Sequence, residues 1–310
     1  MKFEHMKGFC IMTMITRKQF DVLEVLADSK EALSQRDLEA KTHYSLGTIN
    51  HVVKELKEME LASGGKITEK GLNALKPYEV KRAIFVAAGF GSRMAPITLN
   101  TPKPLVRVRG MRIIDRLIDS CLNVGIQEIY VVRGYLSEQF DQLLYKYPMI
   151  KFLENSMFNE ANNISSALVA KDLLSNAYVF EADLLLYNPK IIKKYHYCSN
   201  FLAIQKKRTD DWCFEVRNRV ITEEKIGGEN CWQMVGISFW NEKDGKELSR
   251  DIDEVFHAPG GKERYWEQVP LVYKKEKYSV EVRECFEDDI VEIDTYKELA
   301  TIDSSYEIKM

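Results

Sequence analysis

The 310-residue sequence predicts an α/β protein, with a doubly wound, mixed, Rossmann-like sheet over residues 80–310 and a small separate domain over residues 1–79. Two observations lead to this prediction. From Lys81 onward, apolar runs of strand length alternate with segments of helical periodicity, as in sheets covered by helices on both faces. Residues 1–79 show helical periodicity without that alternation, and a short linker at 77–81 joins the two parts.

The first domain has the pattern of a winged helix. Helices are predicted at 17–28, from Ser34 onward, where the serine serves as the cap, and at 45–60. Gly64 and Gly65 then predict a hairpin turn. Over about 60 residues this segment resembles the MarR-type winged-helix domain, which implies DNA binding, docking or dimerisation.

The charges of this domain decide between those roles. Residues 1–80 contain twelve Lys or Arg and twelve Asp or Glu, and the third helix offers His51 and Lys54 beside Glu55 and Glu58. Strong phosphate binding requires a clear basic excess. We therefore expect weak, unspecific DNA binding and favour docking or a homodimer through the winged helix, with specific DNA binding as the open alternative.

The predicted pattern of strands and helices in the main domain changes near residue 200. Before that point, strands are expected at 82–88, 127–133, 150–154 and 177–183, with helices at 112–124, 136–146, 163–174 and 189–197. Beyond it, strands at 201–206, 213–221, 232–240 and 278–285 and helices at 244–257 and 262–273 predict a partly antiparallel half that covers the site.

The loop after the first strand carries the most specific motif. Gly89 and Gly91 lack a Cβ, so the backbone can turn tightly and its N–H groups can approach a triphosphate. Arg93, and Lys103 between two prolines, supply the positive charge that a polyphosphate requires. The spacing fits neither a Walker loop nor a dinucleotide-binding fingerprint, which needs a third glycine where Met94 stands. The segment resembles a nucleotidyltransferase signature.

Two aspartates predict a metal site. Asp183 ends the strand at 177–183, and the carboxyl ends of parallel strands are where open α/β sheets bind ligands. Asp294 ends a second apolar run just before a helix, where it also fits a helix cap. Together with the phosphate loop, the pair predicts Mg²⁺, which prefers oxygen ligands and bridges phosphate oxygens.

Taken together, these segments are similar to the bacterial CTP:phosphocholine cytidylyltransferases, within the sugar-nucleotidyltransferase superfamily, over about residues 82–305. The matching segments are Ala87-Ala-Gly-Phe-Gly-Ser-Arg93, Thr101-Pro-Lys-Pro-Leu105, Asn162-Asn-Ile-Ser-Ser-Ala167, Glu181-Ala-Asp183, Trp212 and Glu292-Ile-Asp294.

The resemblance implies a Mg²⁺-dependent enzyme that joins CTP to phosphocholine, giving CDP-choline and pyrophosphate by direct in-line attack. No Ser/His or Cys/His arrangement suggests a covalent intermediate. The implied catalytic residues are Lys103, Arg93 and Asp183, the metal ligands Asp183 and Asp294, and the nucleotide-binding residues Ala88, Gly89, Gly91, Ser92, Arg93, Asn163 and Ser166.

The head group of the acceptor requires particular types of residue in its binding site. A quaternary ammonium is best held by aromatic faces with carboxylates nearby. Trp212, Trp266, Glu267 and Glu292 are the predicted substrate-binding residues, although core packing explains either tryptophan equally well. Tyr265, Trp232 and Asp211 are further candidates.

Two other functions remain open at this point. One is the same transfer to 2-aminoethylphosphonate or another small phosphate or phosphonate, whose primary ammonium would favour carboxylates over aromatic faces. The other is a winged-helix transcription regulator whose α/β domain serves as a sensor. The presence of Asp183, Asp294, Lys103 and Arg93 argues against a loss of chemistry.

Composition points to a cytoplasmic protein. The net charge of −3 gives no basic field for nucleic acid or an anionic membrane. Six scattered cysteines without a C-x-x-C pair predict reduced thiols rather than a zinc site or disulfides. The apolar stretch at 8–15 is too short to span a bilayer and lacks a cleavage site, so no membrane insertion is expected.

Overall fold

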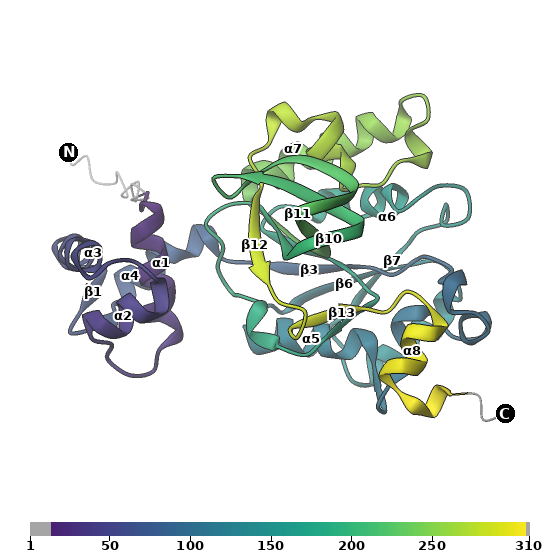
Figure 1. The fold of residues 1–310 in the computed structure, drawn as a ribbon, viewed down its shortest axis with the longest axis horizontal. Helices are drawn as coiled ribbons and strands as arrows, with labels where there is room; N and C mark the ends of the chain where they lie inside the picture. The colour runs from purple at the N-terminus through teal and green to yellow at the C-terminus, as the bar shows by residue number, and fades with distance from the viewer. Residues whose placement is uncertain (1–13, 308–310) are drawn as a thin grey trace, which may run out of the picture. The chain divides into compact units, whose positions relative to one another are not determined.

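The protein is described by a computed structural model covering residues 14–307 (Figure 1). Contacts between residues divide the chain into two compact units, and the boundary in the sequence falls between Glu79 and Val80. Cys10 and most of the apolar stretch at 8–15 lie outside the described residues. Among the residues that are described, no helix combines the length and apolar character needed to cross a membrane.

The N-terminal unit has the winged-helix arrangement that the sequence predicts. As expected, Ser34 caps the second helix, where its hydroxyl accepts a hydrogen bond from the Asp37 N–H at 3.2 Å. Gly64 and Gly65, with φ of 57° and 73°, form the turn of the small hairpin. The elements are α1 (Arg17–Asp28), α2 (Gln35–Thr42), α3 (Leu46–Glu58), β1 (Ala62–Ser63), β2 (Lys66–Ile67) and α4 (Glu69–Leu75).

Helix α3 carries basic side chains that already have acidic partners. The His51 ring lies 3.2 Å from the Glu55 carboxylate, and the Lys54 ammonium lies 3.9 Å from that of Glu58. Such exposed pairs contribute little to stability, but they lower the positive potential that DNA phosphates would meet. Weak DNA binding stays a prediction.

The second unit is built on a mixed sheet, as the sequence predicts. Its seven strands run in the order β10-β12-β11-β8-β3-β6-β7, with β3 parallel to both β6 and β8, and β11 antiparallel to β8. The bounds are β3 (Arg82–Val86), β6 (Glu128–Arg133), β7 (Lys151–Glu154), β8 (Ala177–Glu181), β10 (Asn200–Arg217), β11 (Val220–Trp240) and β12 (Glu281–Cys285).

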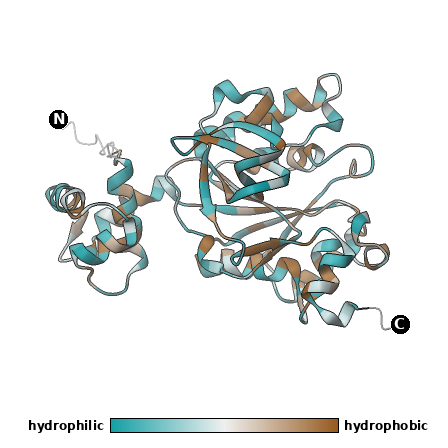
Figure 2. Ribbon diagram, viewed as in Figure 1, coloured by the Kyte–Doolittle hydropathy of each residue, from teal (hydrophilic) through white to brown (hydrophobic). Residues whose placement is uncertain are grey.

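Alternate residues of the central strands enter two separate cores. In β3, Phe85 packs into the core shared with α5 (Ile113–Asn123), whereas Ile84 packs into the core shared with α6 (Ile164–Val169) and α7 (Glu242–His257). Helix α5 therefore covers one face of the sheet and α6 and α7 cover the other (Figure 1). Figure 2 shows brown, hydrophobic stretches in the strands of the sheet and in the helices around it, alternating with teal, hydrophilic ones.

A third, smaller core supports the phosphate loop. Met94, Ile113 and Ile293 are fully buried in it, together with Leu299 of α8 (Tyr296–Ile302). The remaining short strands are β4 (Arg107–Val108), β5 (Met111–Arg112), β9 (Leu184–Leu186) and β13 (Ile290–Glu292). Because β13 pairs with β9, the chain around residue 294 is brought back to the end of β8.

Several expected elements differ in the structure. The strands expected at 201–206, 213–221 and 232–240 belong to one long hairpin, β10–β11, which reverses at Asn218 and Arg219 with φ of 51° and 72°. Those positive φ values allow the two-residue turn that the sequence pattern did not reveal.

Four expected helices are shortened or broken. At 189–197 only one 3₁₀ turn forms, because the Lys194 carbonyl accepts from the Val80 N–H and the Lys193 N–H donates to the Tyr178 hydroxyl, so tertiary contacts use these backbone groups. The segment at 136–146 is 3₁₀ (Ser137–Tyr145), that at 163–174 is α6 plus a 3₁₀ turn, and that at 262–273 is a 3₁₀ turn and a π-helix (Val269–Tyr273).

Candidate active site

A cavity of about 650 Å³ lies at the carboxyl ends of β3 and β8. This is the edge of the sheet where the sequence placed the site. All but one of the predicted site residues line the cavity. They are Ala88, Gly89, Gly91, Ser92, Arg93, Lys103, Asn163, Ser166, Asp183, Trp212, Glu267, Glu292 and Asp294.

The phosphate loop is packed closely against the lysine that follows it. Gly91 has a φ of 61°, and a Cβ at this position would lie 3.0 Å from the Lys103 Cβ and 3.1 Å from the Thr98 Cγ2. The Thr98 hydroxyl also donates to the Gly91 carbonyl at 2.8 Å. Both conformation and space therefore require glycine here, and the loop is held against Lys103.

Lys103 joins the two aspartates that the sequence singled out. Its Nζ lies 2.8 Å from Asp183 Oδ2 and 2.9 Å from Asp294 Oδ1, and Arg93 Nη1 lies 2.8 Å from Asp294 Oδ2. Burial lowers the pKa of Lys103, but attraction from Asp183 and then Asp294 outweighs it and raises the pKa above 10.5. Lys103 is therefore cationic at neutral pH and holds the two carboxylates together.

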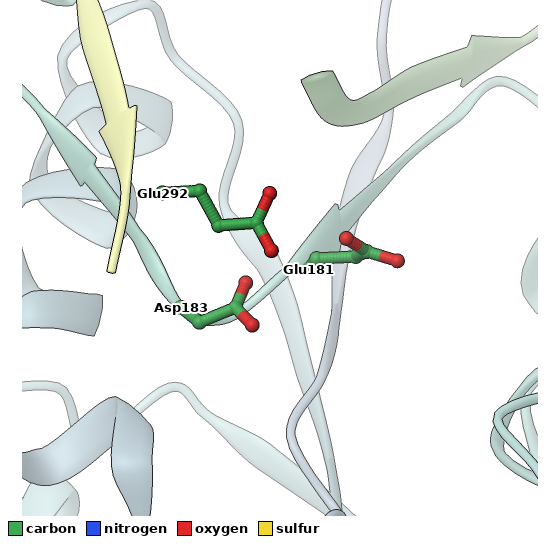
Figure 3. Close-up of side chains that lie close together, drawn as sticks. All are labelled: Glu181, Asp183 and Glu292. Carbon is green, nitrogen blue, oxygen red and sulfur yellow. The ribbon is translucent and has the colours of Figure 1, made fainter. Parts of the chain in front are cut away.

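Two further carboxylate groups converge on Asp183. Glu181, Asp183 and Glu292 each place an oxygen within 4.8 Å of the others. Figure 3 shows the carboxylates of Asp183 and Glu292 turned toward one another and that of Glu181 to one side. Asp183 Oδ1 is buried and has no hydrogen-bond partner among residues 14–307. An unpartnered carboxylate oxygen beside other hard oxygen ligands fits a Mg²⁺ ion.

Burial and the repulsion between these neighbouring carboxylates raise the pKa values of Glu181 and Glu292. Burial, then repulsion from Asp183 and Asp294, raises the pKa of Glu292 to about 9. Burial, then repulsion from Asp183, Glu267 and Glu292, also raises the pKa of Glu181. Each group would ionise more readily if a cation lay beside it. This end of the cavity is therefore suited to cationic ligands.

Asn163 and Ser166 lie where α6 begins. The Asn163 amide donates to Glu267 Oε2 at 3.2 Å and its oxygen accepts from the Trp266 backbone N–H at 2.9 Å. Ser166 is buried, and its hydroxyl accepts from the Asn155 amide at 3.0 Å. Asn163 thus links α6 to the segment that carries Glu267.

The structure corrects one predicted substrate-binding residue. Trp266 is 3% exposed and packs in the core, with its ring 6.0 Å from Phe201 and 6.1 Å from Trp240. The preceding residue, Tyr265, lines the cavity instead, with its ring 5.5 Å from that of Trp212. Adjacent side chains point in different directions, so the burial of Trp266 turns Tyr265 toward the ligand.

Sequence reasoning gave no role to several residues that line the cavity. Asn155, Glu181 and Gly236 are the clearest cases. A signal for Glu181 exists, because it is an acidic residue at the carboxyl end of a parallel strand, the edge of the sheet where ligands bind. Gly236 carries no such signal, because its role depends on a neighbour on another strand.

Glu224, on β11 near the site, allows a test of the electrostatics. Both of its carboxylate oxygens are buried without a hydrogen-bond partner among the described residues, and burial, then repulsion from Glu267, raises its pKa to about 8. In the unfolded chain the group ionises near pH 4.5, so the folded state holds the extra proton and stability falls as pH rises from about 4.5 to 8.

We expect Glu224→Gln to remove this loss, which is at most a few kcal/mol, since one pKa unit corresponds to about 1.4 kcal/mol. The measurement is the free energy of unfolding in urea between pH 5 and 8. Glu223→Gln, at an exposed position of the same strand, is the control. A Glu224→Gln variant with the parent's pH dependence would contradict the expectation.

Both units of the chain resemble known protein families. Residues 82–211 match the family model "Nucleotidyl transferase", and residues 15–63 match "MarR family". The chain is 34% identical over 246 residues to a 2-aminoethylphosphonate cytidylyltransferase of Lancefieldella rimae, covering 76% of this chain and 96% of that protein. It is 31% identical to a choline-phosphate cytidylyltransferase of Haemophilus influenzae, covering 68% and 91%.

The chain is also similar to a cytidylyltransferase of solved structure. The CTP:phosphocholine cytidylyltransferase of Streptococcus pneumoniae superposes with a TM-score of 0.68 at 27% identity, and the match covers 74% of this chain and all of that one.

Proposed function

The chain belongs to the cytidylyltransferases of the nucleotidyl transferase family, and from this premise we propose that it joins CTP to a small phosphonate or phosphate that carries a primary ammonium group, with 2-aminoethylphosphonate as the favoured acceptor. The products are CMP joined to the acceptor through a P–O–P anhydride linkage, and pyrophosphate. The α/β unit performs this reaction, since all the matching motifs lie beyond residue 82.

The charge of the cavity carries the proposal. Two cationic side chains, Arg93 and Lys103, line it together with six carboxylates. Asp183 and Asp294 pair with those cations, which leaves four acidic groups toward the acceptor end. A ligand with its own positive charge compensates such an excess. The four are Glu181, Asp211, Glu267 and Glu292.

The nature of the head group follows from the aromatic residues. With Trp266 in the core, the aromatic residues that line the cavity are Phe90, Phe158, Trp212 and Tyr265, of which Trp212 and Tyr265 belong to the segments that carry Asp211 and Glu267. A primary ammonium donates hydrogen bonds that carboxylates can accept, whereas a trimethylammonium depends on aromatic faces. The lining favours the primary ammonium. Phosphocholine is the second candidate, favoured by the adjacent rings of Trp212 and Tyr265, 5.5 Å apart.

The chemistry needs positioning and charge neutralisation more than proton transfer. An ionised acceptor oxygen attacks the α-phosphorus of CTP in line, and the bond from that phosphorus to the oxygen shared with the β-phosphate breaks, so that this oxygen leaves with pyrophosphate. The N–H groups of the loop around Gly89 and Gly91 bind the triphosphate, with Arg93 on the same phosphates. Lys103 lies close enough to both aspartates to contact the phosphates that meet there, and it stabilises the charge that builds during transfer.

Asp183 and Asp294 are the residues that would hold Mg²⁺, which when bound supplies charge neutralisation at phosphate oxygens. The fit rests on the unpartnered, buried Asp183 Oδ1 and on the carboxylates around it. With Mg²⁺ bound, one of the two contacts of Lys103 with carboxylates would be replaced by a contact with phosphate.

The test is pyrophosphate release from CTP with a panel of acceptors. We expect kcat/KM to rank 2-aminoethylphosphonate and phosphoethanolamine above phosphocholine, and all three above glucose 1-phosphate. Release with none of them would exclude the proposed reaction, and a clear preference for phosphocholine would replace the favoured acceptor with the second candidate.

Trp212 separates the two candidates further. If aromatic faces hold the head group, Trp212→Ala should lower kcat/KM for phosphocholine by about 10-fold, because a cation–π contact contributes roughly 0.5–2 kcal/mol. For a primary-ammonium acceptor we expect a smaller loss, with the KM for CTP unchanged. Trp212→Phe, which keeps an aromatic face, is the matched control. An equal loss for both acceptors would show that Trp212 only shapes the cavity.

A further inference from the structure

Glu181 is the last residue of β8, and it lines the cavity. In β8 the alternate residues Ala177 and Val179 pack in the core with α6 and α7, so Glu181 continues on that face. The same core includes Ile164 at the start of α6 and Trp266, the residue before Glu267. Glu181 therefore lies on the side of the sheet that is covered by α6 and by the segment carrying Glu267.

The opposite strand provides the room for this carboxylate. Ile237 of β11 pairs with Phe180 of β8 in an antiparallel register, so Gly236 lies opposite Glu181. A Cβ on Gly236 would lie 2.7 Å from the Glu181 Cβ and 2.8 Å from its Cδ. Gly236 has no positive φ, so its backbone conformation does not require glycine. Glycine is required at this position because a Cβ would occupy the space of the Glu181 side chain.

The surroundings of Glu181 call for a cation. Asp183 and Glu292 each place a carboxylate oxygen within 4.8 Å of one on Glu181, and Glu267 lines the same cavity. Lys103 is already paired with Asp183 and Asp294 at 2.8 and 2.9 Å. Carboxylates this close together repel one another unless a cation lies beside them, which favours a cationic ligand at Glu181.

The spacing of the carboxylates fits a short aminoalkyl acceptor. Two methylene groups separate phosphorus from nitrogen in 2-aminoethylphosphonate. The carboxylate oxygens of Glu181 and Asp183 approach within 4.8 Å of each other. A phosphonate beside Asp183 and Lys103 can thus place its ammonium at Glu181.

We propose that Glu181, held in the space that Gly236 leaves open, is the residue that selects acceptors carrying an ammonium group. This rests on the proposed function, because it identifies one determinant of the acceptor within that reaction. Glu181 binds the part of the acceptor that does not react, so it acts on specificity rather than on the chemical step.

The experiment compares two acceptors of similar size in the full-length enzyme, 2-aminoethylphosphonate and propylphosphonate, in which a methyl group replaces the ammonium. The measured quantity is the ratio of their kcat/KM values. In the parent enzyme we expect this ratio to be large. In Glu181→Gln we expect it to fall by about 10- to 100-fold, the range for losing a hydrogen bond to a charged group, mainly through a higher KM for the amine. Glu181→Asp, which keeps the charge, should recover part of the ratio.

Gly236→Ala provides an independent approach to the same carboxylate. The added methyl group displaces the Glu181 side chain while leaving its charge in the protein, so the ratio should fall here too. Glu160→Gln is the matched control, because it removes an exposed carboxylate near the cavity that does not line it. We expect that variant to keep the parent's ratio. Should Gly236→Ala fail to fold, the result for Glu181→Gln still tests the role of Glu181.

Each outcome has a separate meaning. A parent enzyme that uses both acceptors equally contradicts the ammonium-bearing acceptor and, with it, the role of Glu181. A parent that discriminates while Glu181→Gln discriminates equally well overturns only the role of Glu181. Weaker Mn²⁺ binding by Glu181→Gln, measured by calorimetry without acceptor, together with an unchanged ratio, would make Glu181 a metal ligand and also overturn it.

Discussion

Asp183→Asn is expected to lower turnover by at least ~10²-fold at ordinary Mg²⁺ concentration, as for the loss of a major electrostatic contributor. The substitution keeps the shape of the side chain but removes the charge that would recruit the metal. It also takes from Lys103 one of its two ionic partners, at 2.8 Å. The measurement is the rate of pyrophosphate release at saturating CTP and acceptor.

The same experiment on Asp294 tests whether the two aspartates act together. Asp294→Asn should lower turnover similarly, because its carboxylate contacts both Lys103 and Arg93. Asp210→Asn, which removes an exposed carboxylate of β10, is the control and should keep full activity. All three variants should retain the parent's melting temperature within a few degrees. Near-normal turnover of Asp183→Asn or Asp294→Asn would show that the metal assignment is wrong.

Lys103→Ala is expected to reduce kcat by about 10²- to 10³-fold, and to raise the KM for CTP much less. Such a split marks an interaction made mainly in the transition state. The structural reason is the position of Nζ, between the carboxylates of Asp183 and Asp294, where the transferred phosphate must come close to the acceptor. Initial rates over a matrix of CTP and acceptor concentrations give both constants.

Arg93 is the matched comparison. Its side chain is 67% exposed and, among the residues that the structure describes, forms an ion pair with Asp294 at 2.8 Å, so we expect it to contact the outer phosphates of CTP. Arg93→Ala should therefore raise the KM for CTP more than it lowers kcat. If Lys103→Ala instead changes only the KM for CTP, Lys103 anchors the nucleotide and has no special role in the transfer step.

Local sequence was enough to predict the parts of this protein whose residues are close together in the chain. The strand at 82–86, the glycine loop and Lys103 follow one another within about 25 residues, so spacing alone indicates a phosphate site. The cap of the second helix at Ser34 and the Gly64-Gly65 turn are local in the same way. The alternation of strands and helices then predicted the sheet, and with it the edge where ligands bind.

Tertiary structure decided which neighbouring side chain faces the ligand and which distant groups meet. Trp266, a predicted substrate-binding residue, fills the core with its larger apolar ring, and the further candidate Tyr265 lines the cavity instead. Glu181 and Gly236 lie opposite one another only through the register of β8 with β11, and Lys103 meets Asp294 across 191 residues of sequence. Strand register and core packing depend on all the elements at once, so no local window of sequence contains them.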